Sequence, residues 1–256
     1  MKHTWKYLVV SAVCFAILPF SAPAQQGEVY SLNVVGFQKM GYESGLEIKS
    51  NPFEGMTLRE VAGNDGKYTT TSDPADADNL LVFDAANQQY IRYYLRSHSS
   101  IGRPEWRIGT QWATNVYLYP GQAYFYRSRL GIVRTNVVAG DVVLASAVTN
   151  TVRPGLQLFS YPFAARVLMS DIDLKNGKYT TTSDPADADN ILKFDSASQQ
   201  YLRYYLRSHS SIGRPEWRIG TVWATNVYVE PGEGFWFRSR VGNPYQWIEE
   251  TPYPNL

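Results

Sequence analysis

Two long segments of the chain have nearly the same sequence. Residues 66–129 and 177–240 align without a gap at an offset of 111, and 51 of the 64 aligned positions are identical. A looser match continues upstream, between residues 45–53 and 155–163. Two copies of domain size predict paired domains rather than a solenoid, which is built from a series of shorter units. We therefore expect two copies of one fold.

The local pattern within each copy is that of β-strands. In the first copy, residues 80–83 and 89–96 flank the polar segment 84–88 and predict a hairpin. Pro120 and Gly121 lie at the centre of a second turn, between residues 115–118 and 123–127. The best helical candidate, residues 56–62, allows at most two turns. We predict an all-β chain of two tandem β-sandwich-like repeats, with a partly open barrel as the alternative.

Differences between the copies indicate which side chains face inward. Pairs such as Leu80/Ile191 and Tyr126/Phe237 exchange one apolar residue for another, as a packed core tolerates, whereas Val82/Lys193 indicates exposure. Alternation along the strands then assigns the neighbours of these positions. The inward set is Ile91, Tyr93, Leu95, Tyr124 and Tyr126, and the outward set is Tyr90, Arg92, Tyr94, Arg96, Phe125, Arg127 and Arg129.

The N-terminal residues have the three parts of a secretory signal peptide. Lys2 and Lys6 form a basic region, residues 7–20 are apolar, and Ala22-Pro23-Ala24 is a small-residue cleavage site. The apolar run is too short to span a bilayer. We predict a signal peptide at 1–24, β repeat 1 at 25–136 and β repeat 2 at 137–256. The mature chain is expected to be exported, to the periplasm, the cell surface or the medium, without a transmembrane segment.

The mature composition argues against two classes of function. Cleavage after Ala24 removes Lys2 and Lys6, so the formal charge changes from +1 to −1, and a near-neutral chain gives no electrostatic reason to bind nucleic acid. The one cysteine, Cys14, leaves with the signal peptide. The mature chain therefore has neither disulfides nor thiolate metal ligands, and its stability has to come from burial.

Several short motifs resemble a known group of proteins. The motifs lie at residues 29–37, 50–53 and 77–84, at Trp106, and at 119–125. Together they resemble exported, duplicated all-β proteins of planctomycete and verrucomicrobial bacteria. The resemblance covers most of the mature chain and implies export and an all-β fold. It supplies no catalytic residue.

An aspartate-rich segment occurs once in each copy. It carries the carboxylates Asp73, Asp76 and Asp78 in the first copy and Asp184, Asp187 and Asp189 in the second. Such hard oxygen ligands suit Ca²⁺, although Asp78 stands where an EF-hand loop requires glycine. The alternative is a turn in which Asp side chains accept bonds from nearby backbone N–H groups. Calcium is thus a minor hypothesis, and we predict no other cofactor.

Hydrolytic sites are weakly indicated. His98 and His209, the mature histidines, each lie in a Ser-His-Ser-Ser sequence, where adjacent side chains on an extended chain point apart. Glu105 and the aspartates could supply a carboxylate pair for glycoside hydrolysis, but the sequence does not give their separation. An enzyme would also carry two nearly identical sites. We therefore expect no enzyme, and a glycoside hydrolase or other hydrolase is the disfavoured reading.

The outward sheet face is the stronger candidate site. Arg guanidinium groups and Tyr rings stack on sugar rings, and guanidinium groups also bind anionic groups. The alternative is that these residues form a ladder of cross-strand Tyr–Arg pairs, which contact one another and serve only solubility. We predict a non-enzymatic protein that binds or assembles at the cell envelope, through polysaccharide or self-association, with paired carbohydrate-binding modules as the alternative. The candidate ligand-binding residues are Arg92, Tyr94, Arg96 and Arg107, repeated as Arg203, Tyr205, Arg207 and Arg218.

Overall fold

The computed structural model describes residues 34–62, 68–175 and 178–253. Within these residues the chain is nearly all β, as the sequence predicts, and it contains two six-stranded antiparallel sheets. No helix in the described part is long and apolar enough to cross a membrane. The predicted signal peptide, 1–24, lies outside the described residues.

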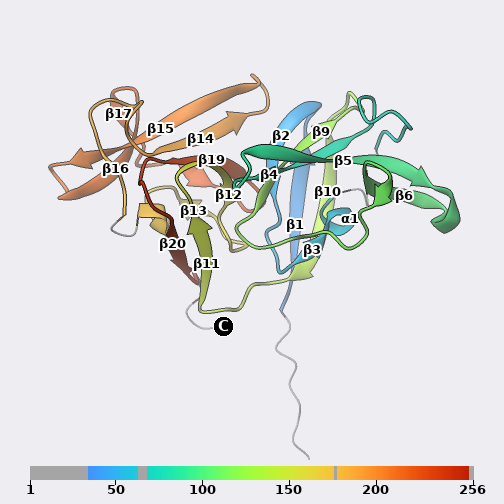
Figure 1. Cartoon of the computed structure of the whole chain (residues 1–256). Helices are drawn as coiled ribbons and strands as arrows, with labels where there is room; N and C mark the ends of the chain where they lie inside the picture. Colours follow the sequence, from blue (N-terminus) through green and yellow to red (C-terminus); the bar gives the residue numbers. More distant parts are fainter. Residues whose placement is uncertain (1–33, 63–67, 176–177, 254–256) are drawn as a thin grey trace, which may run out of the picture. The chain divides into compact units, whose positions relative to one another are not determined.

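The two large sheets have the same strand order (Figure 1). The first sheet runs β2 (Gly45–Ser50), β9 (Ala123–Ser128), β4 (Asn79–Asp84), β5 (Gln89–His98), β6 (Arg103–Ile108) and β7 (Gln111–Trp112). The second runs β12 (Gly155–Ser160), β19 (Gly234–Ser239), β14 (Asn190–Asp195), β15 (Gln200–His209), β16 (Arg214–Ile219) and β17 (Val222–Trp223). Both contain the predicted hairpin, as β4–β5 and as β14–β15.

Smaller strand pairs accompany each large sheet. β1 (Val35–Tyr42) pairs with β10 (Arg134–Asp141), and β3 (Met56–Thr57) with β8 (Tyr117–Leu118). Their counterparts are β11 (Ala147–Val152) with β20 (Tyr245–Glu250), and β13 (Val167–Leu168) with β18 (Tyr228–Val229). The boundary expected between residues 136 and 137 falls inside β10.

Helical segments are short. The predicted candidate at 56–62 is one turn of helix, α1 (Leu58–Val61), which begins with a capping box between Thr57 and Glu60. Two 3₁₀ turns, η1 (Ser99–Ile101) and η2 (Asp173–Lys175), complete the described elements.

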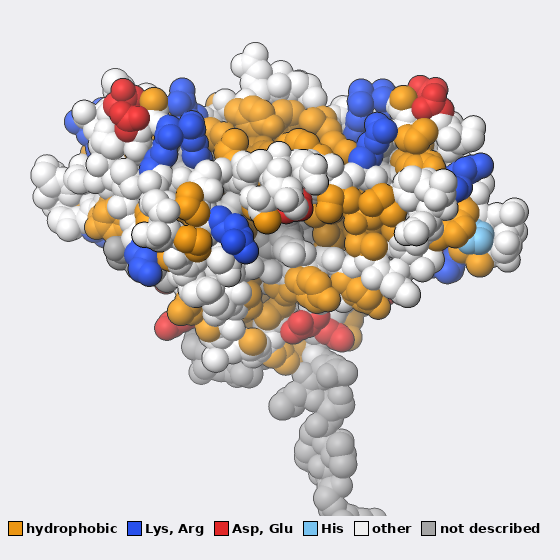
Figure 2. All heavy atoms as spheres, in the orientation of Figure 1, with side chains coloured by type: hydrophobic (Ala, Val, Ile, Leu, Met, Phe, Trp, Pro, Cys, Tyr) orange, Lys and Arg blue, Asp and Glu red, His pale blue; other side chains and the backbone are white. Residues whose placement is uncertain are grey.

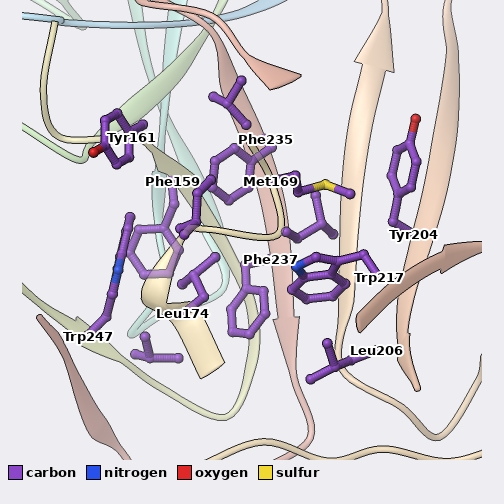
Figure 3. Packing of buried hydrophobic residues seen from close by; sticks show 14 of the residues in the cluster. Phe159, Tyr161, Met169, Leu174, Tyr204, Leu206, Trp217, Phe235, Phe237 and Trp247 are labelled. Carbon is purple, nitrogen blue, oxygen red and sulfur yellow. The ribbon is translucent and has the colours of Figure 1, made fainter. Parts of the chain in front are cut away.

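Each repeat has its own hydrophobic core on one face of its large sheet. In the first repeat the predicted inward residues Tyr93, Leu95, Tyr124 and Tyr126 are buried there with Trp106. Figure 3 shows the second core, which contains Phe159, Tyr161, Met169, Leu174, Tyr204, Leu206, Trp217, Phe235, Phe237 and Trp247. Burying such large side chains is the main favourable contribution to folding in a chain without disulfides.

The opposite faces of the two large sheets are joined by another apolar cluster. This inter-repeat cluster contains Ile48, Ala123, Phe125, Leu158 and Trp236, with Leu81, Phe83 and their counterparts at its margin. The prediction that Phe125 faces solvent is therefore wrong, because its side chain is 1% exposed. Alternation places Phe125 on the correct face of the strand, but the other repeat covers that part of the face.

Hydrogen bonds between the repeats occur in reciprocal pairs. The Ser50 N–H donates to the Gly232 carbonyl at 2.9 Å, and the equivalent Ser160 N–H donates to the Gly121 carbonyl at 3.0 Å. The side-chain amide of Gln88 donates to the Leu156 carbonyl at 3.1 Å, and that of Gln199 to the Leu46 carbonyl at 3.0 Å. Reciprocity of this kind characterises the isologous interface of a two-fold dimer, here formed within one chain.

Gly234 provides a test of this interface. A Cβ at Gly234 would lie 2.5 Å from the Cβ of Ala123 and 2.5 Å from Cγ2 of Ile48, both in the other repeat. We expect Gly234→Ala to lower the free energy of unfolding by about 1–3 kcal/mol, because the interface has no room for the methyl group. Gly242→Ala, whose Cβ would meet nothing within 4 Å, is the matched control and should change it by less than about 0.5 kcal/mol.

Urea unfolding of the two variants measures the difference. Because Ala123 and Gly234 are equivalent positions that face each other, the double variant Ala123→Gly/Gly234→Ala should recover part of the lost stability, since it removes the contact with the Ala123 methyl group but leaves that with Ile48. Equal stabilities of Gly234→Ala and Gly242→Ala would contradict the close packing.

Candidate binding surface

The face that carries the inter-repeat cluster continues into the predicted arginine face. On the first sheet Leu81 lies opposite Arg92 and Phe125, and the next row places Asn79 opposite Tyr94 and Arg127. The second sheet repeats this pattern, with Leu192 between Arg203 and Trp236 and with Asn190 between Tyr205 and Arg238. Directly opposed residues in an antiparallel sheet share a face. Each sheet therefore presents one face that is apolar near the other repeat and arginine-rich beyond it.

The candidate residue Tyr94 is not exposed, which corrects the sequence-based assignment. Its side chain is 5% exposed, and its hydroxyl donates to the Gly109 carbonyl at 3.0 Å. Tyr205 makes the same bond to the Gly220 carbonyl. The turns that follow β6 and β16 engage these rings, so neither ring is available to stack on a ligand.

Arg107 also contributes mainly to local structure. Its guanidinium donates to the Gly109 and Thr110 carbonyls at 3.0 and 2.9 Å and lies 5.2 Å from the centre of the Trp112 ring. The imidazole of His98 stacks on Trp112 at 3.9 Å. In the second repeat Arg218 donates to the Thr221 carbonyl and lies over Trp223, on which His209 stacks. These arginines are occupied in holding the turn between two strands.

Three further arginines on this face of each sheet have no carboxylate partner among the described residues. We define the first arginine group as Arg92, Arg96 and Arg127 and the second as their equivalents, Arg203, Arg207 and Arg238. All six are exposed or half-exposed, and none forms an ion pair with an acidic side chain of the described residues. Glu105, opposite Arg96, is buried and accepts a bond from the Trp106 N–H instead.

Aromatic side chains from both repeats lie between the two arginine groups. We call Phe83, Tyr90 and Phe125, with their equivalents Phe194, Tyr201 and Trp236, the aromatic band. Tyr90 contacts Phe83 edge-on at 5.2 Å and Trp236 of the other repeat at 6.2 Å, and Tyr201 contacts Phe194 at 5.0 Å. Burial, and to a smaller extent Tyr201, raises the pKa of Tyr90 to about 12.

The outer edge of the aromatic band is open to solvent. Tyr90 and Tyr201 are each 46% exposed. Figure 2 shows a hydrophobic band with a group of basic side chains on each side of it. The pair Tyr90 and Tyr201 was not among the candidate ligand-binding residues, although both tyrosines are identical in the two copies and outward by alternation.

The aspartate-rich segments use their oxygens to form structure. Asp73 accepts the Ala75 N–H at 2.8 Å, as the turn alternative predicts. Asp78 is buried and accepts the Tyr126 hydroxyl at 2.8 Å and the Arg129 N–H at 2.7 Å. Asp184 and Asp189 make the corresponding backbone bonds in the second repeat, while Asp76 and Asp187 share a segment with them. Among the described residues, no three acidic or histidine side chains are placed to hold a metal ion.

Comparisons of the chain with protein-family models, with curated proteins and with solved structures found no match.

Proposed function

We propose that the chain is an exported, non-enzymatic protein that binds an acidic polysaccharide through its two arginine groups and the aromatic band between them. The signal-like N-terminus supports export. The polysaccharide is one that carries a carboxylate on its sugar rings at regular intervals. The single observation that carries the proposal is the presence of six accessible arginines that have no carboxylate partner among the described residues and lie beside exposed tyrosine rings.

The chemistry of these groups fits a sugar acid. A guanidinium binds a carboxylate through two parallel N–H···O bonds, which fixes the direction of approach as well as the charge. Rings such as Tyr90 and Tyr201 offer flat apolar surface with few internal rotations to restrict, so they can contact a pyranose ring at little entropic cost. A charged and a flat group side by side favour an anionic sugar over a neutral sugar or a simple ion.

The duplication favours a polymer over a single sugar. Each repeat presents the same three arginines at equivalent register positions, with the aromatic band between them. A polymer that reaches both groups would gain avidity because the second contact becomes intramolecular. A monosaccharide would occupy each group separately.

Calorimetric titration with polygalacturonate, with neutral dextran as the negative probe, tests the proposal. The variant Arg92→Gln/Arg127→Gln/Arg203→Gln/Arg238→Gln should bind polygalacturonate at least about 100-fold more weakly than the original chain, because four charge-assisted contacts are lost. The control variant Lys39→Gln/Arg59→Gln/Arg153→Gln/Lys178→Gln removes the same charge from other elements and should lose less than about tenfold.

Two results would contradict this function. Equal losses in both variants would mean that binding is a non-specific attraction. If the original chain does not bind polygalacturonate and light scattering shows that the face variant dissociates an oligomer, the arginine groups serve self-assembly instead.

A further inference from the structure

A cleft of about 680 Å³ lies where the two repeats meet, away from the residues of the arginine groups. β2 contributes Glu47 and Lys49 from the first repeat. The second repeat contributes Lys193 from β14, and Glu230 and Glu233 from the turn between β18 and β19. We call it the charged cleft. Its volume is that of a small-molecule site, and its lining contains groups of both charges.

The duplication supplies an internal reference for this cleft. Across the 64 aligned positions, a charged residue replaces an uncharged one three times: Lys193 for Val82, Glu230 for Tyr119 and Glu233 for Gln122. All three charged residues line the charged cleft. On the first repeat's side, Glu47 and Lys49 correspond to Gln157 and Phe159.

The equivalent cleft on the other side of the interface is smaller and less charged. It has a volume of about 240 Å³ and is lined by Val82, Gln122, Gln157 and Phe159, among others. The aligned segments are otherwise nearly identical, so the extra charges of the second copy are concentrated at one of two equivalent places. A general requirement of the fold would act on both clefts alike.

The charged side chains do not link the repeats to each other. Lys49 pairs with Glu47 at 2.6 Å within the first repeat. Lys193 pairs with Glu233 at 3.0 Å and donates to the Tyr228 carbonyl at 2.6 Å within the second. Glu47 is 3% exposed, and its burial raises its pKa while the Lys49 ammonium opposes the rise. Burying charges in this way is costly, and cross-repeat attraction between these ion pairs does not explain it.

We propose that the charged cleft binds a small zwitterion with one carboxylate and one ammonium group, namely a free amino acid or a short peptide. The ligand carboxylate is received by the ammonium groups of Lys49 and Lys193, and the ligand ammonium by the carboxylates of Glu233 and Glu47. A purely anionic ligand would meet those carboxylates, and a purely cationic one would meet the basic groups of the lining, which are Lys39, Lys49, Arg166 and Lys193. The cleft shares Phe194 with the aromatic band but none of the six arginines, and the proposal does not depend on polysaccharide binding.

Calorimetry with L-alanyl-L-alanine as the probe tests the assignment on the whole chain. N-acetyl-L-alanyl-L-alanine lacks the ammonium, and L-alanyl-L-alaninamide lacks the carboxylate, so each should bind at least about tenfold more weakly than the zwitterion. The stoichiometry should be one per chain, because the equivalent cleft has Val82, Gln122 and Phe159 in place of Lys193, Glu233 and Lys49.

The second copy of the sequence provides the variants. Lys193→Val/Glu233→Gln installs the residues of the first repeat, removes both members of one ion pair together, and should weaken dipeptide binding at least about tenfold while the thermal midpoint stays within a few degrees. Ser198→Asn/Val222→Gln makes the same kind of exchange outside the cleft and should bind as the original chain does. The proposal is overturned if neither the dipeptide nor free alanine, lysine or glutamate binds saturably at about 10 mM. It is also overturned if both exchange variants bind the dipeptide equally.

Discussion

Replacing Trp236 with alanine should lower the free energy of unfolding by about 3–5 kcal/mol, the range for removing a large aromatic side chain from a core. Strand alternation places Trp236 on the face away from its own core, yet it is 6% exposed. Its ring packs edge-on against Phe83 at 4.7 Å and lies 6.1 Å from Phe125, both of the first repeat. Truncating the Trp236 side chain would therefore leave a buried cavity between the two repeats.

Chemical denaturation of Trp236→Ala and of Trp223→Ala makes the comparison. Trp223 is half-exposed on β17 and stacks on His209, so its removal should cost about 1 kcal/mol. A double-mutant cycle between Trp236→Ala and Phe125→Ala should show coupling of at least about 0.5 kcal/mol, because the two rings are in contact across the interface. A loss for Trp236→Ala no larger than that for Trp223→Ala would mean that the repeats do not stabilise each other.

Strand alternation predicts which face a side chain occupies but not what covers that face. Tyr93 and Leu95 were correctly placed in the core, because apolar residues at every second position indicate a buried face. Phe125 was placed on the correct face and wrongly in solvent, because the other repeat covers it. The sequence does contain an indication of this contact. Leu81, Phe83 and Phe125, and their equivalents in the second copy, are apolar on the face that alternation assigns to solvent, as expected where two sheets pack.

The sequence also does not decide what the aspartate-rich segments do. Asp73 and Asp78 could ligate a cation or accept hydrogen bonds, since both roles need the same carboxylate oxygens. The choice depends on partners far along the chain. Asp78 accepts bonds from Tyr126 and Arg129, about fifty residues later, and no local pattern predicts that contact.

The charged cleft combines residues that the sequence separates widely. Lys49 and Lys193 line one space only because the repeats pack through reciprocal contacts, and the alignment of the copies does not predict that packing. The alignment does show where the two copies differ in charge, at Lys193, Glu230 and Glu233. The sequence therefore shows which charged residues distinguish the copies, and the structure shows that these residues line one cleft.

Replacing two of the three arginines of one group should affect a polymer far more than a short ligand. In Arg92→Gln/Arg127→Gln the second group remains, so a digalacturonate should bind about as tightly as before at half the number of sites. Polygalacturonate should bind about 10²–10⁴-fold more weakly, because it can no longer contact both groups of one chain at once. The mirror variant, Arg203→Gln/Arg238→Gln, should give the same result, since the two sheets present equivalent rows.

Titrating the original chain and these two variants with digalacturonate and polygalacturonate, in the same buffer and salt, tests most directly whether the paired sheet faces act as one bivalent site. We predict a steep, matched loss of polymer affinity in both variants with little change in dimer affinity. Polymer affinity that stays within about twofold of the original in either variant would contradict the account.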